Sequence, residues 1–498
     1  MPKDRQRPFL FVFAVTGIEL HKVKDYILSH LGHQPTLDQE DACEELVRFL
    51  YSAEPNAACI LCGYAGTGKT SLVSALIKSA PYLKIHTVLL APTGRAAKVL
   101  AGYSGHKAYT IHKKIYITTP DPSGNLRVVR GVNRHKYTLF IVDEASMIGV
   151  SDLTGEGGYK KSLLDDLCEY VKSGDHCRLL FVGDTAQLPP VGESESPALD
   201  SRFLALEMLI KPSMAELTEV VRQKNESGIL AIATKLRDDI SNLTDMEPAK
   251  LPLFTRNIWS YSDVKCINGG DLEEVLYKEY SENSVESAVI ICRTNKRANI
   301  YNQAIRNRIL FREGEINAGD FLMVVKNNYH WLGDDSNIGF IANGDVVEVL
   351  SVRNQEDLYG FRFADVTIRF IDYLDEPTLD CKIILETLYS DSPNLSRESL
   401  KNLYSAIAED YIDITSMSER NRAIHSNPYY NALQVKFAYA LTCHKTQGGQ
   451  WNTAIIEQGY LTNDMITKEY LRWLYTAVTR ATKRVYLLNF DSNFFYNE

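Results

Sequence analysis

Residues 63–70 read GYAGTGKT, and their types and spacing are those of a phosphate-binding loop. The glycines allow successive backbone N–H groups to converge on phosphate oxygens, and the N-terminus of a following helix adds its dipole. Lys69 would reach the β and γ phosphates, and the Thr70 hydroxyl would ligate Mg²⁺. The residues predicted to hold the triphosphate are Gly63, Gly66, Thr67, Gly68, Lys69, Thr70 and Ser71.

The flanking residues predict the elements that position this loop. Residues 57–62 form a short apolar run that is typical of a buried strand, and residues 71–77 have the spacing of a helix that buries one face. A strand, a glycine-rich turn and a helix in this order distinguish a P-loop from an ordinary glycine-rich turn. The sequence therefore predicts a site for a nucleoside triphosphate.

Two further apolar runs end in residues suited to phosphoryl transfer. Residues 139–147 read LFIVDEASM, in which Asp143 would hold Mg²⁺ directly or through water and Glu144 would orient and deprotonate the attacking water. Residues 179–192 read LLFVGDTAQLPPVG, a second buried strand followed by a polar turn. In that turn we expect Gln187 to sense the γ-phosphate.

Earlier segments suggest contacts to the base of the nucleotide and to a second phosphate-bearing partner. Gln39 begins a helix that Thr36 or Asp38 would cap, and its amide can pair with the edge of adenine. Residues 87–100 form a strand, a turn and a helix, and the turn holds Thr93 and Arg95 at the carboxyl end of the strand, where ligands bind in open α/β sheets.

A hairpin is predicted between the segment Thr110-Ile111-His112 and the strand that ends at Asp143. Residues 115–119 and 126–130 are rich in β-branched residues, and residues 120–125 between them form a turn. We expect this hairpin, within residues 113–136, to project from the main sheet, with Tyr116 as a candidate surface on which a base could stack.

Composition is that of an ordinary globular protein. The chain has 498 residues, 45% of them apolar, which suffices for about three domains. No apolar run approaches the roughly 18 residues of a membrane span. The apolar residues 9–15 fit either a signal peptide or a packed strand or helix. The net charge of −9 requires any nucleic-acid surface to be a local patch.

The nine cysteines are scattered and suit a reduced, cytoplasmic protein. Cys59 and Cys62 form a C-x-x-C pair, but side chains three positions apart on a strand point to opposite faces. We therefore expect both to be core residues and not a metal site. No zinc signature appears in the sequence.

The ordered motifs resemble those of superfamily one DNA helicases, and in particular the RecD and Dda branch, whose members move 5′ to 3′ on single-stranded DNA. In the first half the matching segments are GYAGTGKT, LAPTGRAA, TIH, VDEASM and GDTAQLPPVG. In the second half they are LTEVVRQ at 217–223, VIICRTNKRANIYNQAIR at 289–306, YALTCHKTQGGQW at 439–451 and WLYTAVTRATKRV at 473–485. The resemblance runs from Gln39 to Arg480 and so covers nearly the whole chain.

The resemblance implies an α/β fold with two RecA-like P-loop motor domains, a β-hairpin insert and an SH3-like β-barrel insert. The implied divisions are an N-terminal helical segment 1–36, a first motor domain 37–245 with its hairpin at about 113–136, a second motor domain 246–310 and 431–498, and an inserted barrel 311–430. Within that insert, the D-x-K match at Asp380 and Lys382 has no convincing upstream acid partner, so a strand edge is preferred to a nuclease site.

The resemblance also implies roles for residues that periodicity does not single out. Arg222 would touch the γ-phosphate, and Arg480 would act as an arginine finger from the second domain. Gly448 and Gln450 would belong to the nucleotide site, although the family usually has glutamate where this chain has Gln450, which puts tight ribose selectivity in doubt. The residues expected to contact DNA are Thr93, Arg95, His112, Tyr116, Thr442 and His444.

Together these features predict an ATP-dependent 5′-to-3′ DNA helicase that uses ATP and Mg²⁺ and acts on single-stranded and tailed duplex DNA. Accessory repair or recombination proteins are further expected partners, and no membrane association is expected. Two alternatives stay open: a translocase that displaces proteins without separating strands, and an ATP-gated binding subunit that scarcely hydrolyses. Four groups suited to hydrolysis, Glu144, Gln187, Arg222 and Arg480, count against the binding subunit.

Overall fold

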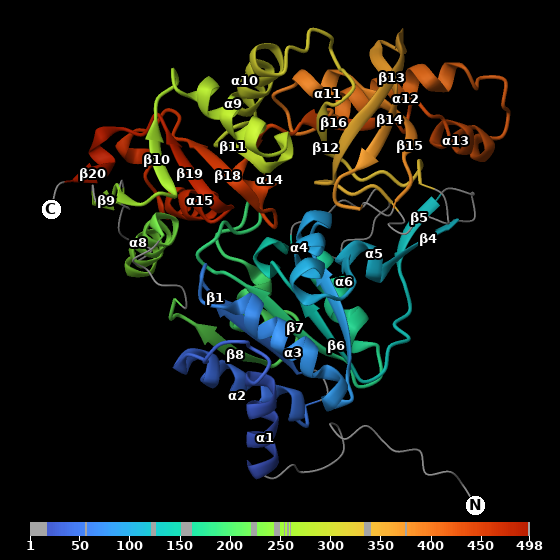
Figure 1. Ribbon diagram of the computed structural model, residues 1–498. Coiled ribbons are helices and arrows are strands. Elements are labelled where there is room, and N and C mark those ends of the chain that lie inside the picture. Colours follow the sequence, from blue (N-terminus) through green and yellow to red (C-terminus); the bar gives the residue numbers. More distant parts are fainter. Residues whose placement is uncertain are drawn as a thin grey trace, which may run out of the picture.

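Figure 1 shows the computed structural model, in which two parallel sheets and a barrel lie in separate regions of the molecule. The structure describes residues 17–54, 57–120, 126–150, 162–220, 227–243, 250–252, 254–255, 258, 260–332, 340–373 and 376–496. The apolar run at residues 9–15 and the predicted γ-phosphate contact Arg222 lie outside these ranges. Two parallel sheets with a barrel insert confirm the predicted fold class.

Six parallel strands, in the order β3-β2-β6-β7-β1-β8, form the sheet that carries the P-loop. They are β1 Ala58–Gly63, β2 His86–Ala91, β3 Ala108–Thr110, β6 Thr138–Val142, β7 Arg178–Gly183 and β8 Pro212–Leu217. Strands β1, β6 and β7 are buried along their whole length, as expected for a parallel sheet covered on both faces. Because these three strands are neighbours, the loops at their carboxyl ends meet at one edge.

Helices cover both faces of this first sheet. They are α1 Gly17–Leu28, α2 Leu37–Tyr51, α3 Lys69–Leu83, α4 Gly94–Ser104, α5 Ile111–Ile115, α6 Leu163–Lys172 and α7 Ser201–Leu206. Cys59 packs in the apolar cluster under α1, α2 and α3, whereas Cys62 packs in the cluster under α5 and α6. The predicted opposite orientation of these two cysteines is confirmed, and all nine cysteines are free.

The second sheet has five parallel strands in the order β10-β19-β18-β11-β17. They are β10 Val264–Ile267, β11 Ala288–Cys292, β17 Ala440–Thr442, β18 Trp451–Glu457 and β19 Ala481–Leu488. Its helices are α8 Gly228–Asn242, α9 Leu272–Glu282, α10 Asn295–Ala304, α14 Cys443–Thr446 and α15 Lys468–Val478, and α10 continues as the π-helical turn η6 Ile305–Ile309. A short strand pair, β9 Phe254–Thr255 and β20 Phe495–Tyr496, lies beside them.

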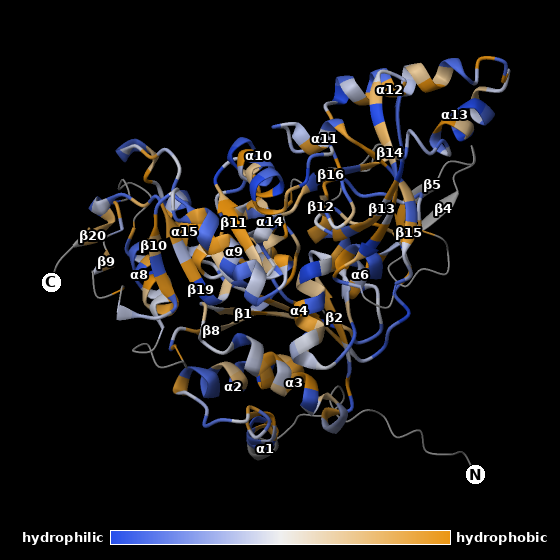
Figure 2. Cartoon of the chain, turned by 45° about the horizontal axis from the view of Figure 1, so that its top comes forward, coloured by the Kyte–Doolittle hydropathy of each residue, from blue (hydrophilic) through white to orange (hydrophobic). Residues whose placement is uncertain are grey.

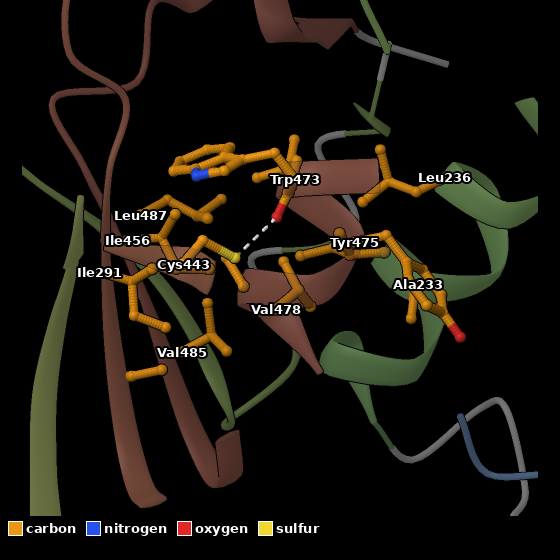
Figure 3. Close-up of a cluster of buried hydrophobic side chains, with 14 of the residues drawn as sticks. Ala233, Leu236, Ile291, Cys443, Ile456, Trp473, Tyr475, Val478, Val485 and Leu487 are labelled. Atoms are coloured by element: carbon orange, nitrogen blue, oxygen red, sulfur yellow. Dashed lines mark hydrogen bonds between the residues drawn. The ribbon is translucent and has the colours of Figure 1, made fainter. Parts of the chain in front are cut away.

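Helix α8 lies within the predicted first motor domain, residues 37–245, but it packs against the second sheet. The sequence placed α8 with the first domain, but Ala233 and Leu236 pack with Trp473, Tyr475 and other residues of the second sheet and its helices (Figure 3). The apolar face of α8 therefore belongs to the second core, a long-range contact that local periodicity does not reveal.

A closed five-stranded barrel forms the insert. Its strands are β12 Phe321–Val324, β13 Val346–Leu358, β14 Phe361–Phe370, β15 Leu379–Ile384 and β16 Leu433–Phe437, and the last strand lies beyond the predicted end at 430. The helices in the described part of the insert are α11 Glu386–Tyr389, α12 Arg397–Glu409 and α13 Met417–His425. Leu403 of α12 and Ile424 of α13 pack with Phe363 of the barrel, so residues 390–430 form a helical cover on it.

The D-x-K residues are structural parts of strand β15. Asp380 accepts hydrogen bonds from Thr367 (2.6 Å) and Arg353 (3.0 Å). Lys382 forms ion pairs with Glu356 (2.8 Å) and Asp365 (2.7 Å). The side chains of Asp380 and Lys382 thus bond to neighbouring strands. This agrees with the prediction from the sequence that these residues belong to a strand edge.

The hairpin consists of β4 Tyr116–Pro120 and β5 Leu126–Arg130, which pair with each other and with no other described strand. In Figure 1 it stands apart from the first sheet, near the barrel. Figure 2 shows that apolar residues concentrate in the strands and polar ones on the outer faces of the helices. No helix among the described residues is long and apolar enough to cross a membrane.

Short 3-10 turns complete the described elements. They are η1 Ala145–Met147, η2 Pro197–Leu199, η5 Val285–Ser287, η7 Asn463–Met465 and η8 Ser492–Phe494. Turn η1 matters most for the site, because it begins directly after the adjacent acids Asp143 and Glu144.

Candidate functional site at the junction of the two sheets

The P-loop connects β1 to α3, and its backbone geometry requires glycine at two positions. Gly68 caps α3 with φ of +88°, a conformation that residues with a Cβ rarely adopt. A Cβ on Gly63 would lie 2.8 Å from Thr67 Oγ1 and 3.0 Å from Leu217 Cβ. These glycines allow the loop to close tightly over the end of β1.

Lys69 begins α3 and turns back over the loop. Its Nζ donates to the carbonyl oxygens of Gly63 and Tyr64, the latter at 2.9 Å, and lies 3.9 Å from Asp184 Oδ2. Thr70, the next residue, is exposed at the first turn of the helix. The cation and the hydroxyl expected to face the phosphates and the metal thus both lie at the mouth of the loop.

The adjacent acids Asp143 and Glu144 follow the carboxyl end of β6, the strand that pairs with β7. Asp143 accepts hydrogen bonds from the Tyr103 hydroxyl (2.7 Å) and from the Glu144 N–H (2.9 Å). Burial raises the pKa of Asp143, and these two donors oppose the shift. Glu144 has φ of +53°, which is uncommon for a residue with a side chain and marks local strain.

Glu144 lies near both positively and negatively charged side chains. Burial raises its pKa, and the neighbouring carboxylate of Asp143 adds to the increase. The positive charges of Arg480, from the second domain, and of Lys69 act in the opposite direction. The structure therefore brings charged groups from both sheets within electrostatic range of one carboxylate.

The loop after β7 contributes Asp184 and Gln187. Gln187 lines a cavity of about 300 Å³ together with Ser146, Asp184 and Arg472. Its Oε1 is buried and has no hydrogen-bond partner among the described residues. An unpaired amide oxygen in a cavity is available to a water molecule or ligand group, because leaving it unpaired is unfavourable.

Helix α15 crosses from the second sheet to this loop. The Tyr475 hydroxyl donates to Asp184 Oδ2 (2.7 Å), and Thr476 Oγ1 accepts the Leu188 N–H (2.9 Å). Gln447, in the loop after α14, donates to the Leu188 carbonyl (2.7 Å). Arg472 donates to Ser194 O and to Glu195, each at 2.6 Å. The whole loop after β7 is therefore held by the second domain.

Arg480 lies just after α15 and is buried. Its guanidinium donates to three oxygens of its own domain, which are Thr476 O (3.0 Å), Gly449 O (3.3 Å) and Thr479 Oγ1 (3.3 Å). These bonds fix the side chain beside the junction, where its charge acts on Glu144.

Gln39 is buried against the P-loop with both ends of its amide in use. Its Oε1 accepts the Thr36 N–H and its Nε2 donates to Thr67 O, both at 3.3 Å. The Thr36 hydroxyl in return accepts the Gln39 N–H, which completes a capping box at the start of α2. The amide thus supports the loop in this structure, and contact with adenine would require it to exchange these partners.

The turn at Thr93 and Arg95 meets the second domain on the other side of the junction. The Arg95 guanidinium stacks 3.9 Å from the centroid of the Trp451 ring. A Cβ on Gly448 would lie 2.7 Å from Ala96 Cβ and 3.2 Å from Thr93 Oγ1. Gly448 therefore lies against the turn at Thr93 and Arg95, which is predicted to contact DNA. Gln450, two residues further along the chain, is exposed.

The other residues predicted to contact DNA lie along the same side of the junction. His112 on α5 has its ring 6.2 Å from that of Phe340, in the barrel region, and burial lowers its pKa to about 4. Thr442 ends β17 and precedes His444, whose pKa burial also lowers. Tyr116 lies at the base of the hairpin, where its hydroxyl donates to Asp166 (2.8 Å). That bond anchors the hairpin to α6 and places Tyr116 away from the hairpin tip.

Comparisons with known proteins match both halves of the chain. Residues 36–247 match the model of an AAA domain, and residues 437–488 match that of the UvrD-like helicase C-terminal domain. The ATP-dependent RecD2 DNA helicase of Deinococcus radiodurans is 30% identical over 222 residues, which cover 43% of this chain and 27% of that protein. The ATP-dependent DNA helicase dda of Enterobacteria phage T4 is 31% identical over 183 residues, covering 35% of this chain and 37% of that protein.

Both halves of the chain thus resemble superfamily one helicases of the RecD/Dda-like branch. The chain spans about a quarter to two fifths of the length of the two helicases above. An uncharacterized mimivirus protein from Acanthamoeba polyphaga mimivirus is similar over a longer stretch, with 25% identity across 85% of this chain and 94% of that protein. Among solved structures, that of Pif1 helicase from Bacteroides with ADP-AlF3 and ssDNA covers 89% of this chain and 92% of that chain, with 16% identity and a TM-score of 0.45.

Several residues of this candidate site were not predicted from the sequence motifs. Asp184 could have been found, because it follows a buried strand at the same sheet edge as Asp143. Tyr103, Tyr475 and Trp451 gave no such signal, since each is an aromatic residue in an ordinary helix or strand pattern. Their contacts with Asp143, Asp184 and Arg95 arise only when distant segments pack together.

Proposed function

We propose that this protein is an ATP-hydrolysing motor that moves 5′ to 3′ along single-stranded DNA and separates the strands of a tailed duplex. The observation that carries the proposal is the meeting of α15, from the second sheet, with the P-loop and the loop after β7 from the first. A binding switch has no need of a second domain at this position. Similarity to RecD2 and Dda, both ATP-dependent DNA helicases, supports it.

The residues at the loop fit a nucleoside triphosphate with Mg²⁺. The positive φ angles of Gly66 and Gly68 give the backbone the curvature of an anion-binding loop, and Lys69 supplies the cation. Thr70 and Asp143 offer oxygen ligands of the kind that Mg²⁺ prefers. Bound Mg²⁺ would neutralise charge on the phosphates.

In this proposal the remaining groups divide the work of hydrolysis. Glu144 orients and deprotonates the attacking water, and Gln187 positions groups at the γ-phosphate. Arg480, joined by Arg222, neutralises the charge that develops during transfer. Because Arg480 and Lys69 come from different domains, turnover depends on closure of the junction, and that dependence couples hydrolysis to movement.

The strand would run along the side of the junction that carries Thr93, His112 and Thr442. A local basic patch supports this path in a chain of net charge −9. The Nζ atoms of Lys107, Lys113 and Lys114 lie 5.5, 6.0 and 5.4 Å from the centroid of the Tyr109 ring. Burial, with Lys107 adding to it, lowers the pKa of Lys113 to about 8, so a bound phosphate would stabilise its charged form.

The hairpin is the proposed pin against which the strands part. Its base is fixed, because Tyr116 and Arg130 both bond to Asp166 of α6, at 2.8 and 3.3 Å. Beyond the base it exposes the apolar side chains of Ile117, Val128 and Val129, which are 52%, 41% and 38% exposed. A stiff base with an exposed apolar face suits contact with an opened base pair.

Duplexes with a single 5′ tail, a single 3′ tail or no tail test the proposal. With ATP, the 5′-tailed duplex should be unwound at least about tenfold faster than the others. Preferred unwinding of the 3′-tailed duplex would refute the polarity. DNA-stimulated ATPase without unwinding of any substrate would favour a translocase that displaces proteins.

A further inference from the structure

The hydroxyl of Tyr475 joins three separate parts of the junction. It donates to Asp184 Oδ2 at 2.7 Å and accepts the N–H of Ala65, in the P-loop, at 2.9 Å. Tyr475 itself belongs to α15 of the second sheet, whereas Ala65 follows β1 and Asp184 follows β7 of the first. A single oxygen atom thus bridges both domains and two loops of the nucleotide site.

This hydroxyl is not needed for packing. Figure 3 shows Tyr475 on α15 among buried apolar side chains such as Ala233, Leu236 and Val478, where a phenylalanine ring would fill the same space. Tyr475 is 1% exposed, and burial beside the Asp184 carboxylate raises its pKa far above the ordinary value. The group is therefore a neutral donor with two fixed partners. Its removal would leave a buried N–H and one carboxylate oxygen without this partner.

The proposed arginine finger, Arg480, lies directly after the same helix. Arg480 Nε donates to Thr476 O, and the Thr476 side chain accepts the Leu188 N–H of the loop after β7. Asp184 Oδ2, which accepts the Tyr475 hydroxyl, lies 3.9 Å from Lys69 Nζ. A displacement of α15 would therefore move Arg480 and alter the contacts of both Ala65 and Asp184 at once.

We propose that the Tyr475 hydroxyl is a positioning group that couples closure of the two domains to the P-loop. When the junction closes, its two hydrogen bonds align the P-loop, which leads into Lys69, with helix α15, which Arg480 follows. When the junction opens, both bonds break together. This inference rests on the proposed ATP-driven function. It identifies the contact through which binding of single-stranded DNA by the two domains is coupled to the nucleotide site.

Tyr475→Phe tests the inference, and Tyr470→Phe is its matched control. Tyr470 lies on the same helix and is 3% exposed, but its hydroxyl has no hydrogen-bond partner among the described residues. In Tyr475→Phe the DNA-stimulated kcat should fall about tenfold and the rate without DNA by a smaller factor, so that stimulation by DNA declines, while KM for ATP changes less than about twofold. Tyr470→Phe should leave all three values unchanged.

A binding measurement provides a readout that does not depend on turnover. The affinity for a fluorescent single strand is measured with and without a non-hydrolysable ATP analogue, and the ratio of the two affinities reports coupling. That ratio should move toward one in Tyr475→Phe and stay at the wild-type value in Tyr470→Phe. Thermal unfolding of both variants confirms that each is folded.

Two results would overturn the inference. One is a Tyr475→Phe protein that matches Tyr470→Phe in kcat, KM and affinity ratio. The other is an equal loss of rate with and without DNA at an unchanged affinity ratio, which indicates local structure only. Failure of the proposed function looks different, because wild-type protein would then show no DNA-stimulated ATPase.

Discussion

The two sides of the junction between the domains differ in how their polar groups are satisfied. On the nucleotide side, direct hydrogen bonds cross between the domains, from the Tyr475 hydroxyl to Asp184 and from the Leu188 N–H to Thr476. On the strand side, where the single-stranded DNA is proposed to bind, the domains meet through close packing of Gly448 and through the stacking of Arg95 on Trp451. The first arrangement is directional and breaks all at once, whereas packing and stacking tolerate small shifts.

The distribution of positive charge shows the same contrast. Lys69 and Arg480, on the nucleotide side, each donate to oxygens of neighbouring residues. Lys107, Lys113 and Lys114, near the strand side, surround Tyr109 and form no ion pair with another described residue. The difference suggests that nucleotide binding replaces existing bonds, while the strand side receives a polyanion with little rearrangement.

The largest effect is expected from removing Arg480, whose charge acts on Glu144 across the junction. Arg480→Ala should lower kcat for ATP about 10³-fold, in the range seen for arginine fingers. Single-strand affinity should change less than about threefold, because Arg480 lies on the nucleotide side. Steady-state ATPase and fluorescence anisotropy measure the two effects. A comparable loss of DNA affinity would show that the two sides are not separate.

Glu144→Gln should lower kcat about 10²–10³-fold by removing the base. Affinity for ATP should persist, because Lys69, Thr70 and Asp143 are retained. Binding of a fluorescent ATP analogue serves as the second measurement, with Lys69→Ala as the comparison that loses both binding and turnover. Near-normal hydrolysis in Glu144→Gln would remove Glu144 from its role.

Shortening the hairpin should separate strand opening from the motor. A Gly-Ser turn in place of residues 118–128 leaves Ile115 in the core and Tyr116 bonded to Asp166. Unwinding of a 5′-tailed duplex should fall more than about tenfold, while DNA-stimulated ATPase stays within about twofold. Each base-pair step requires about 1.4 kcal/mol to open, so loss of a wedge matters at every step. An unchanged unwinding rate would show that the hairpin is not a pin.

The smallest expected effect concerns Asp345, which brings the barrel against the turn at Gly94. Its Oδ2 accepts the Ala342 N–H (2.7 Å), its Oδ1 has no partner among the described residues, and burial raises its pKa to about 7. The folded state thus holds this proton more tightly than the unfolded state, where the pKa is near 3.8. Stability contributed by the proton is therefore lost as the pH rises from about 4 to about 7.

Asp345→Asn should remove this dependence and raise the thermal midpoint by roughly 2–4 °C at pH 8. At pH 4.5 and below, the midpoints of variant and wild type should converge. Differential scanning calorimetry across this range checks the effect, with the exposed Asp413→Asn as the control. A gain that is the same at both pH values would assign it to something other than the carboxyl proton.

Short-range signals singled out most of the residues of the candidate site. A P-loop, two acids after a strand and an arginine after an apolar helix are fixed by local sequence, and the sheet order places their loops together. The position of α8, the extension of the barrel to β16 and the bonds of Gln39 and Tyr475 depend on contacts between segments far apart in the chain. Periodicity in one segment carries no information about such partners.

The most direct measurement of the central claim is the ATPase rate of the wild-type protein with and without single-stranded DNA. If strand binding favours closure of the junction that brings Arg480 toward Lys69, saturating single-stranded DNA should raise kcat several-fold, about five or more. The same DNA should give no increase in Arg480→Ala. An equal wild-type rate with and without DNA would contradict the account.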